Sequence, residues 1–434
     1  MAPASERAPR HVIPLGAADA LDAALVGPKA ATLARLARAG LPVPDARCLS
    51  AGAYHVQLAA AGTTAAAARV AGADGLEARR LALGVKLGFL QAPLAPAVAD
   101  ALGDLAAWVV TPPATQVAVR SSALREDAPG ASFAGQFDTF LGVTGEGDLV
   151  TAVRACWASL WAARALRYME AHDVDPAGTA MAVLVQRMVA ARAAGGALSR
   201  TADGAVLLTG TWGLGSAVAQ GEVVPDRWVL ARDATLESVE PGRKDRRVAL
   251  EPDGGARPEA VEPSLVETPC LLPDEAVGLT RLVLEAERVV GEPVEVEWAR
   301  DERGFQILQA RPLQVAPGFD VDEVWLRHPA LRGQPAGVGW GTGPACVVVH
   351  EHDLEHVKLG DVLVTQVAGP ALTAVLSRVA GVVAELGGST SHLAALARER
   401  GIPAVLGVGG ATRRIPEGAT VAVDGVTGLV RWIR

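Results

Sequence analysis

Residues 382–406 decide the fold and read VVAELGGSTSHLAALARERGIPAVL. The β-branched run at the start predicts a short strand, which Gly387 and Gly388 end. The hydroxyl side chains at 389–391 can cap a helix that follows. Gly401 suits the left-handed position after the last turn of that helix, and the proline beyond it cannot continue the helix. The stretch therefore predicts a strand, a glycine turn, a helix and a second strand.

A single histidine, His392, stands at the start of this predicted helix. The positive end of a helix disfavours an imidazolium ion, so we expect His392 to be neutral and nucleophilic at about neutral pH. The free N–H groups at the same helix end can hold an anion, such as a phosphoryl group carried by the histidine. Spacing alone leaves open that His392 is only a polar residue at a helix start.

This stretch resembles the phosphohistidine motif of the PEP-utilising enzymes, which include phosphoenolpyruvate synthase, pyruvate phosphate dikinase and rifampicin phosphotransferase. The matching residues are Gly387-Gly388-Ser389-Thr390-Ser391-His392, Ala397-Arg398 and Gly401-Ile402-Pro403-Ala404-Val405. The resemblance implies that His392 accepts a phosphoryl group and swings with its domain between two sites. Leu393 departs from the family, which usually has alanine there, and would crowd the acceptor side.

Composition limits the class of protein. A chain of 434 residues predicts two or three domains, and a net charge of −8 argues against a nucleic-acid surface. The four cysteines are far apart, so we expect buried thiols in a reducing compartment rather than zinc ligands or disulfides. The N-terminus lacks the apolar region of a signal peptide, and no apolar run is long enough to span a bilayer. We therefore expect a cytoplasmic protein with no nucleic-acid and no membrane partner.

Lys29 lies in the string VGPKAATLARLARAGLPVP, which predicts a helix ended by Gly40 and Pro42. A lysine at a helix start adds a point charge to an end that already attracts anions, which suits a nucleotide phosphate. The alternative is an ordinary solvated surface lysine. The string resembles the opening of the family's ATP-grasp domain, where this lysine contacts phosphate. It is not a Walker A loop, because the required glycines are absent.

The string VAVRSSALREDAPGASFAGQFDTFL places Arg120 at the end of a strand, before a loop of small residues. The planar donors of arginine and closely approaching backbone N–H groups suit a polyphosphate. Pairing of Arg120 with Glu126 or Asp127 is the structural alternative. The string matches the family's ATP-grasp loop nearly residue for residue, which implies nucleotide contacts for Gly135 and Thr139.

Gln186 follows an apolar strand and can offer both a donor and an acceptor to a base edge. The matching family glutamine lies in the cleft between two subdomains where adenine binds. Two positions depart from the family. Residues 199–204 are degenerate where the family has a glycine-rich element, and Ser216 replaces the usual glutamate. The first departure leaves the role of that loop open, and Ser216 is expected to weaken the site if the family's glutamate supports it.

The string VEVEWARDERGFQILQARP predicts an antiparallel hairpin. On its second strand Ile307, Gln309 and Arg311 share one face. A loop of three or five residues would put Glu295 and Glu297 on that same face, whereas a loop of four would not. An odd loop is therefore predicted for a functional hairpin.

Glu297 and Gln309 are oxygen ligands of the kind that suits Mg²⁺, and Arg311 can neutralise the charge that develops beside the metal. An exposed, salt-bridged hairpin is the alternative. The string ILQARP resembles the end of the family's ATP-grasp domain. The resemblance implies that Glu297, Gln309 and Arg311 bind ATP, with Mg²⁺ held by the first two.

Three weaker patterns favour structural interpretations. Trp157 and Trp161 recur at helical spacing, which predicts core rather than a cofactor site. The basic run at 243–247, which includes Lys244, predicts a solvated surface. The histidines at 350, 352 and 356 have a spacing that metal sites use, but acidic neighbours favour an exposed turn.

The sequence thus predicts α/β and α+β structure, in a two-part ATP-grasp domain followed by a small β/α swivelling phosphohistidine domain. The predicted boundaries are 1–195 and 196–313 for the two ATP-grasp subdomains, 314–340 for a Pro/Gly-rich linker and 341–434 for the phosphohistidine domain. The resemblance covers nearly the whole chain but offers no third, substrate-binding domain. We therefore expect the phosphoryl acceptor on the histidine domain, between the domains, or on another polypeptide.

The predicted function is a dikinase-type phosphotransferase that moves the ATP β-phosphate through His392 to a small-molecule acceptor, giving AMP and phosphate. One alternative is a subunit of a larger kinase whose acceptor site lies on a partner chain. The other is a nucleotide-binding regulator that has lost transfer, for which Ser216 and the 199–204 stretch are the support. The fold does not name the acceptor.

Overall fold

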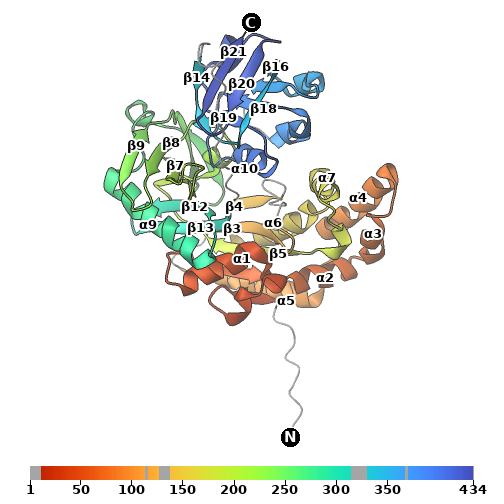
Figure 1. Ribbon diagram of the computed structural model, residues 1–434. Helices are drawn as coiled ribbons and strands as arrows, with labels where there is room; N and C mark the ends of the chain where they lie inside the picture. Colours follow the sequence, from red (N-terminus) through yellow and green to blue (C-terminus); the bar gives the residue numbers. More distant parts are fainter. Residues whose placement is uncertain (1–10, 113–115, 127–136, 314–329, 367–369, 434) are drawn as a thin grey trace. The chain divides into compact units, whose positions relative to one another are not determined.

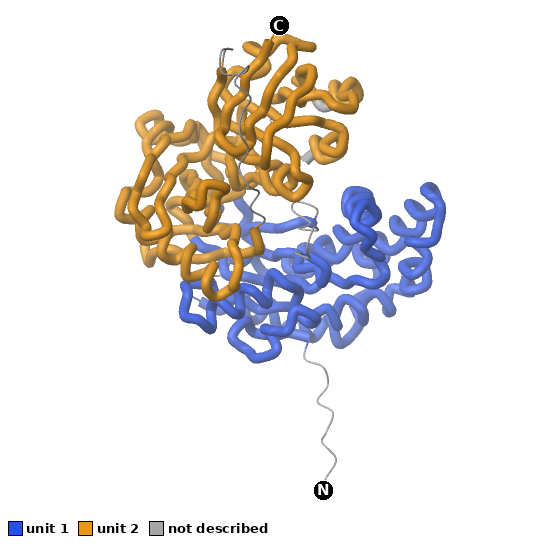
Figure 2. The backbone as a smooth tube through the Cα atoms, viewed as in Figure 1, with its two compact units in different colours: residues 1–189, 250–256 blue, residues 190–249, 257–434 orange. Residues whose placement is uncertain are grey.

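The computed structural model describes residues 11–112, 116–126, 137–313, 330–366 and 370–433. The chain divides into two compact units, which are described separately (Figure 2). Unit 1 comprises residues 1–189 and 250–256, and unit 2 comprises residues 190–249 and 257–434. Both combine helices with sheets, so the predicted α/β and α+β class is confirmed.

Unit 1 is an antiparallel sheet with helices packed around it, in the strand order β1-β2-β5-β3-β4 (Figure 1). The strands are β1 (Val12–Pro14), β2 (Ala46–Leu49), β3 (Val117–Ala123), β4 (Thr139–Val143) and β5 (Met181–Arg187). The helices are α1 (Ala23–Arg38), α2 (Ala51–Ala60), α3 (Thr64–Arg69), α4 (Gly75–Gln91), α5 (Pro96–Val109), α6 (Gly145–Ser159) and α7 (Ala163–Ala171).

Local sequence explains where several of these helices begin. The carboxylate of Asp22 accepts a hydrogen bond of 2.8 Å from the amide of Ala24, and that of Asp74 accepts one of 3.0 Å from Glu77. Each aspartate thereby satisfies an amide that has no partner inside its helix. The predicted aromatic core is also present, because Trp157 is fully buried and its indole donates to the carbonyl of Met181 at 3.0 Å.

Unit 2 contains an antiparallel sheet of six strands in the order β13-β12-β6-β7-β8-β9. The strands are β6 (Ala193–Leu198), β7 (Val206–Trp212), β8 (Asp226–Leu230), β9 (Leu236–Glu240), β12 (Val294–Asp301) and β13 (Gly304–Pro312). Helix α9 (Pro273–Val290) packs on this sheet and ends at Gly291, whose φ of 92° is left-handed. A short helix, α8 (Ser216–Ala219), and a hairpin of β10 (Arg246–Leu250) and β11 (Ala256–Ala260) complete this part.

The second sheet of unit 2 has eight strands in the order β14-β21-β20-β16-β17-β18-β19-β15. They are β14 (Ala330–Arg332), β15 (Gln334–Pro335), β16 (Trp340–Val348), β17 (Val362–Thr365), β18 (Gly381–Ala384), β19 (Ala404–Leu406), β20 (Thr420–Asp424) and β21 (Leu429–Ile433). The helices are α10 (His392–Glu399) and α11 (Ala411–Arg414). The strand, turn, helix and strand predicted from residues 382–406 are therefore β18, α10 and β19 with the turn between them.

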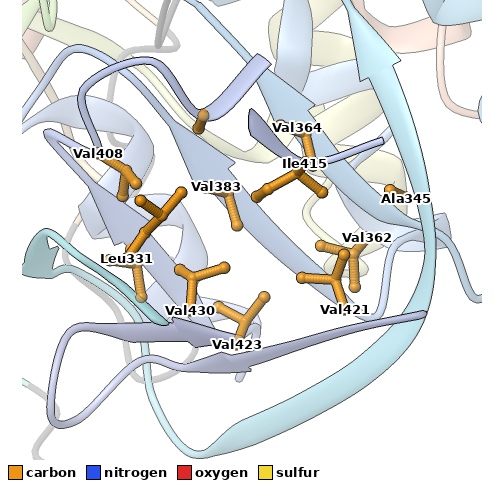
Figure 3. Packing of buried hydrophobic residues seen from close by; sticks show 12 residues of the cluster. Leu331, Ala345, Val362, Val364, Val383, Val408, Ile415, Val421, Val423 and Val430 are labelled. Carbon is orange, nitrogen blue, oxygen red and sulfur yellow. The ribbon is translucent and has the colours of Figure 1, made fainter. Parts of the chain in front are cut away.

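This sheet has its own valine-rich core (Figure 3). Val362, Val364 and Val383 come from the parallel strands and point toward Val421 and Val423 of the antiparallel strand β20. β-Branched side chains suit strands because their restricted rotamers pack on a pleated surface. Each fully buried valine contributes about 1.5–3 kcal/mol relative to an exposed one.

The predicted linker is too long at its C-terminal end. Residues 314–329 lie outside the described residues, but residues 330–340 form β14, β15 and the start of β16. Backbone pairing fixes them, because Leu331 pairs with Val430 and Gln334 pairs with Leu406. Proline and glycine therefore mark tight connections between short strands here rather than a linker.

The prediction that Lys244 belongs to a solvated basic surface is wrong. Its side chain is fully buried and forms an ion pair with the equally buried Asp226. The carboxylate of Asp226 also accepts hydrogen bonds of 2.8 Å from the amides of Gly242 and Cys270. Pairing together with hydrogen bonding is what lets a charge stay buried.

Among the described residues, no helix by itself has both the length and the apolar character needed to cross a membrane. Helices α4 and α5 meet these criteria only as a pair, and the pair is bent by 57°.

We predict that the native chain resists thiol reagents. All four cysteines are free and buried, and burial raises the pKa of each thiol above its ordinary value. The reactive thiolate is therefore scarce in the folded state at about pH 8. Ellman's reagent should release no colour within minutes from the native chain, and should titrate all four thiols after unfolding in guanidinium. Rapid reaction of any cysteine in the native chain would contradict this burial.

Candidate functional site

The lysine predicted to bind phosphate is buried in unit 1. Lys29 lies on α1 with 6% of its surface exposed, so it is not a solvated surface lysine. Its ammonium donates to the carbonyl of Ser121 at 2.7 Å and pairs with the carboxylate of Glu126 at 3.0 Å. These contacts use two of the three donors of the ammonium group and fix its position beside β3.

A kink in α1 at Gly27 precedes Lys29 and helps to determine where its side chain lies. Gly27 has φ 77° and ψ 159°, a conformation open almost only to glycine, and Pro28 restarts the helix after it. A Cβ atom on Gly27 would lie 2.2 Å from the Oγ atom of Ser122. Ser122 in turn donates to the carbonyl of Val26 at 2.8 Å, so the kink is held closely against β3.

The other described candidates of unit 1 share one face of its sheet. Arg120 pairs with Thr139 on β4 and with Leu184 on β5. Gln186 lies two residues beyond Leu184, so it projects from the same face as Arg120 and Thr139. Gln186 and Arg120 are buried, whereas Thr139 is exposed. Gly135, the remaining predicted contact, lies outside the described residues.

The hairpin of β12 and β13 places Glu297, Gln309 and Arg311 on one face, as predicted, but a β-bulge rather than an odd loop brings this about. Asp301 pairs with Gly304, so the connecting turn has two residues and the predicted odd loop is wrong. A register shift lies between Glu297, which faces Gln309, and Trp298, which faces Ile307. The extra residue on β13 is a β-bulge, which moves all later side chains to the opposite face.

Because of the bulge, Gln309 and Arg311 face the same side as their partners Glu297 and Glu295. Ile307 lies on the opposite face with Trp298, so the prediction that it shares a face with Gln309 is wrong. Glu295, which is 8% exposed, is the acceptor for two arginines. Its Oε2 atom accepts from Arg311 at 2.9 Å and from Arg398 of α10 at 3.0 Å.

The segment that carries the predicted nucleophile begins with a capped helix. We call residues 387–399 the His392 segment. Gly387 adopts a left-handed φ of 94°, and the hydroxyl of Ser391 caps α10 by accepting from the amide of Ala394 at 3.3 Å. His392, the first residue of α10, is half-buried. Leu393 is 3% exposed and therefore belongs to the packing of α10.

The His392 segment contacts the six-stranded sheet on the face that carries Glu297. The hydroxyls of Thr390 and Thr209 are 2.5 Å apart, and a Cβ atom on Gly196 would lie 2.5 Å from that of Thr390. Gly196 pairs with Glu297 on one side and with Thr209 on the other. Residues paired across strands share a face, so these contacts and the side chains of Glu297, Gln309 and Arg311 lie on one face.

A second set of contacts lies at the turn before the helix. Gln334 donates to the carbonyl of Pro225 at 2.8 Å, and its side-chain oxygen accepts from the amide of Ser389 at 3.3 Å. The amide of Gly387 donates to the carbonyl of Val223 at 3.2 Å. A Cβ atom on Gly388 would lie 2.5 Å from Pro225, so only glycine permits this approach.

Comparison with known families agrees with the sequence motifs. Residues 23–323 match the family described as pyruvate phosphate dikinase, AMP/ATP-binding domain, and residues 357–428 match the PEP-utilising enzyme mobile domain. The chain belongs to the PEP-utilising enzyme family.

Among its curated relatives, a probable phosphoenolpyruvate synthase of Methanothermobacter thermautotrophicus is 37% identical over 72% of this chain and 46% of its own length. The phosphoenolpyruvate synthase of Aeropyrum pernix is 33% identical over 94% of this chain and 56% of its own length. The phosphoenolpyruvate synthase of Deinococcus radiodurans is 34% identical over 72% of this chain and 43% of its own length. The chain thus spans about half the length of these PEP-utilising relatives.

A solution structure titled Enzyme I (nEIt) shares 36% identity over 18% of this chain and 33% of its own, with a TM-score of 0.17. A TM-score this low carries no argument about the fold.

For this family member, the donor set on the hairpin suits a hard cation. Glu297 and Gln309 offer a carboxylate and an amide oxygen from paired positions, and Mg²⁺ usually takes few protein ligands and keeps water and phosphate oxygens. Among the described residues, no group of three His, Cys, Asp or Glu side chains could hold a metal ion. His350, His352 and His356, which are among the described residues, form no such group.

Sequence reasoning missed Arg398 and Thr209 as neighbours of the predicted site. Arg398 lies within the family motif, but its partner Glu295 is 103 residues away along the chain. Thr209 lies in an apolar strand that carries no motif. Register in the folded sheet, rather than any local pattern, brings both residues to the His392 segment.

The two departures from the family, residues 199–204 and Ser216, lie in a turn and at the start of a short helix. Residues 199–205 connect β6 to β7 by a tight turn, in which the amide of Thr201 donates to the carbonyl of Ala205 at 2.9 Å. Ser216 opens α8, and its buried hydroxyl has no hydrogen-bond partner among the described residues. Weakening of the site by Ser216 stays a prediction.

We predict that Gly27→Ala destabilises the chain by about 2 kcal/mol, because alanine cannot easily adopt the φ and ψ of the kink and its Cβ would strike Ser122. Gly84→Ala is the matched control, since Gly84 lies in helical backbone of α4 with nothing within 4 Å of its Cβ position. The control should be neutral or stabilising by up to about 1 kcal/mol. Guanidinium unfolding curves of both variants measure the difference, and equal stability would contradict the strained kink.

Proposed function

We propose that this chain is an ATP-dependent phosphotransferase of the dikinase type, with His392 as the residue that carries the phosphoryl group. The observation that supports this most directly is the seating of the His392 segment. It lies on the sheet face that presents Glu297, Gln309 and Arg311. The helix that carries the proposed nucleophile and the three hairpin residues expected to bind Mg·ATP thus belong to unit 2.

The chain's own residues have separate tasks in this proposal. ATP is bound by residues of both units in this proposal. They are Lys29, Arg120, Gly135, Thr139 and Gln186 of unit 1, and Glu297, Gln309 and Arg311 of unit 2. Arg311 and Lys29 balance the charge of the phosphates, and rigid placement beside β3 and β13 lowers the entropy cost of orienting them. Glu297 and Gln309 hold Mg²⁺, which supplies charge neutralisation on the phosphate oxygens when bound.

In the covalent step a ring nitrogen of His392 forms a bond to the β-phosphorus of ATP, and the bond from that phosphorus to the oxygen of AMP breaks. Water cleaves the bond between the β- and γ-phosphates, which releases the γ-phosphate as inorganic phosphate. The net change is that ATP, water and His392 give phosphohistidine, AMP and inorganic phosphate. A covalent intermediate divides one difficult transfer into two easier ones. The positive end of α10 favours the anionic group that His392 then carries.

The acceptor in the second step is suggested by the relatives. They are named phosphoenolpyruvate synthase, so phosphoenolpyruvate, and with it pyruvate as acceptor, comes first among the compounds to test. Since this chain spans about half of those relatives, an acceptor site on another chain is an equal subject of the test. AMP release that depends on added pyruvate would assign the acceptor, and release that needs a co-purified protein would assign the partner.

We predict that incubation with [β-³²P]ATP labels the wild-type chain and leaves His392→Ala unlabelled, because the label resides on that histidine. His356→Ala is the control, since His356 is exposed and distant in sequence from the motif. It should be labelled like wild type. With [γ-³²P]ATP the label should appear as free phosphate. Equal labelling of His392→Ala and wild type would overturn the proposal, and a protein label from the γ position would indicate a simple kinase.

We predict that Glu297→Gln raises the Mg²⁺ concentration needed for labelling by at least about tenfold, because it removes the charge of a hard-metal ligand while keeping its size. Glu302→Gln is the matched control, because Glu302 is exposed at the turn of the same hairpin. Titration of the initial labelling rate against Mg²⁺ measures both. An unchanged Mg²⁺ requirement in Glu297→Gln would exclude Glu297 as a metal ligand.

A further inference from the structure

The contact between Glu295 and Arg398 joins two parts of unit 2 that have different tasks. Glu295 stands on β12 next to the predicted metal ligands, whereas Arg398 lies on the same helix as His392. The Glu295 and Arg398 side chains are each only 9% exposed, and their oxygen and nitrogen atoms are 3.0 Å apart. A pair this well shielded from solvent is screened much less than a surface salt bridge.

Arg398 also holds the turn before the nucleophile. Its Nη1 atom donates to the carbonyl of Ser389 at 2.5 Å and to that of Ala336 at 3.4 Å, while its Nη2 atom donates to Glu295. One guanidinium therefore ties β12 to the backbone three residues before His392. The planar fork of arginine makes this possible, and a lysine in its place could not reach these acceptors together.

The other partner of Glu295 faces the predicted nucleotide site. Arg311 and Arg398 donate to the same oxygen of Glu295, at 2.9 and 3.0 Å. Two guanidinium groups thus share one carboxylate. An anion that draws Arg311 away would leave the whole of the Glu295 charge to Arg398.

From these contacts we propose that Arg398 is a positioning residue. Together with Glu295 it forms a latch that holds the His392 segment on the six-stranded sheet, and the competition with Arg311 makes the latch tighter when phosphate is bound. This inference rests on the proposed function, because docking matters for phosphorylation only if His392 takes the group from ATP. Binding and docking then reinforce each other, as linkage requires.

A second contact lets docking be measured without any activity. The hydroxyls of Thr209 and Thr390 are 2.5 Å apart across the same junction. Cysteines at these two positions should join in a disulfide under mild oxidation only when the segment is docked, since a disulfide demands close Cα atoms. The four natural cysteines are buried and should not compete.

The first test is the disulfide yield of Thr209→Cys/Thr390→Cys in the full chain. Adding Arg398→Gln should lower the initial rate of cross-linking by at least about tenfold, because it removes one partner of a buried charge pair. Arg400→Gln is the matched control. Arg400 lies just after α10, and its guanidinium donates to the carbonyl of Thr373 at 3.3 Å. Its substitution should therefore leave cross-linking unchanged. Equal cross-linking with and without Arg398 would overturn the latch.

The second test is single-turnover labelling of His392 from saturating [β-³²P]ATP. Arg398→Gln should slow labelling at least about tenfold even at saturating ATP, where weaker ATP binding through the lost linkage no longer affects the rate. In the oxidised double-cysteine chain the same substitution should no longer slow labelling, since the disulfide replaces the latch. Slow labelling that the disulfide does not restore would overturn a positioning role.

Two further variants protect the tests from a folding defect. If Arg398→Gln does not fold, Arg398→Lys keeps the buried charge and should show the same slow cross-linking. Glu295→Gln should also slow cross-linking, because it removes the negative charge that the two arginines share. The outcomes also separate the two proposals. If the wild-type chain takes no label from ATP, the proposed function fails, whereas the cross-linking rates still decide whether Arg398 holds the docked segment.

Discussion

One extra residue in the hairpin of β12 and β13 determines what the six-stranded sheet presents. Without the bulge, a two-residue turn would leave Gln309 and Arg311 on the face opposite Glu297 and Glu295. Trp298 and Ile307 pack on the buried side, and that side must be apolar whatever the chemistry requires. The bulge lets one short hairpin satisfy both demands. Because of the bulge Arg311 faces Glu295 and donates to it, and Glu295 is also the carboxylate to which Arg398 donates.

Much of the fold around His392 is readable from local sequence. β18, the left-handed glycines at 387 and 401, and the cap of Ser391 each follow from a residue type whose backbone preference is strong. The matches to two families support the same architecture over most of the chain. The roles of the individual site residues remain predictions, because they depend on ligands rather than on backbone.

The errors have a common physical origin. A period of two in the sequence cannot show where a strand gains an extra residue, so the turn length and the face of Ile307 were mispredicted. Composition cannot show that Lys244 pairs with Asp226, which lies on β8 and 18 residues earlier in the chain, so the basic run was predicted to be a solvated surface. Arg398 was overlooked for the same reason, since its acceptor lies 103 residues earlier in the chain. Local patterns predict local structure, whereas pairing between distant residues decides which charges are buried.

The junction under the His392 segment contains several small and polar groups. Its close contacts include glycines at 196, 387 and 388, the hydroxyls of Thr209 and Thr390, one ion pair and the side chain of Pro225. The valine core of the eight-stranded sheet lies inside that sheet and takes no part in the junction. Separating the two surfaces would therefore expose hydroxyl, guanidinium and carboxylate groups that water can solvate. Contacts between groups that water can solvate cost less to separate than contacts between apolar side chains, so polar contacts suit a junction that has to be reversible.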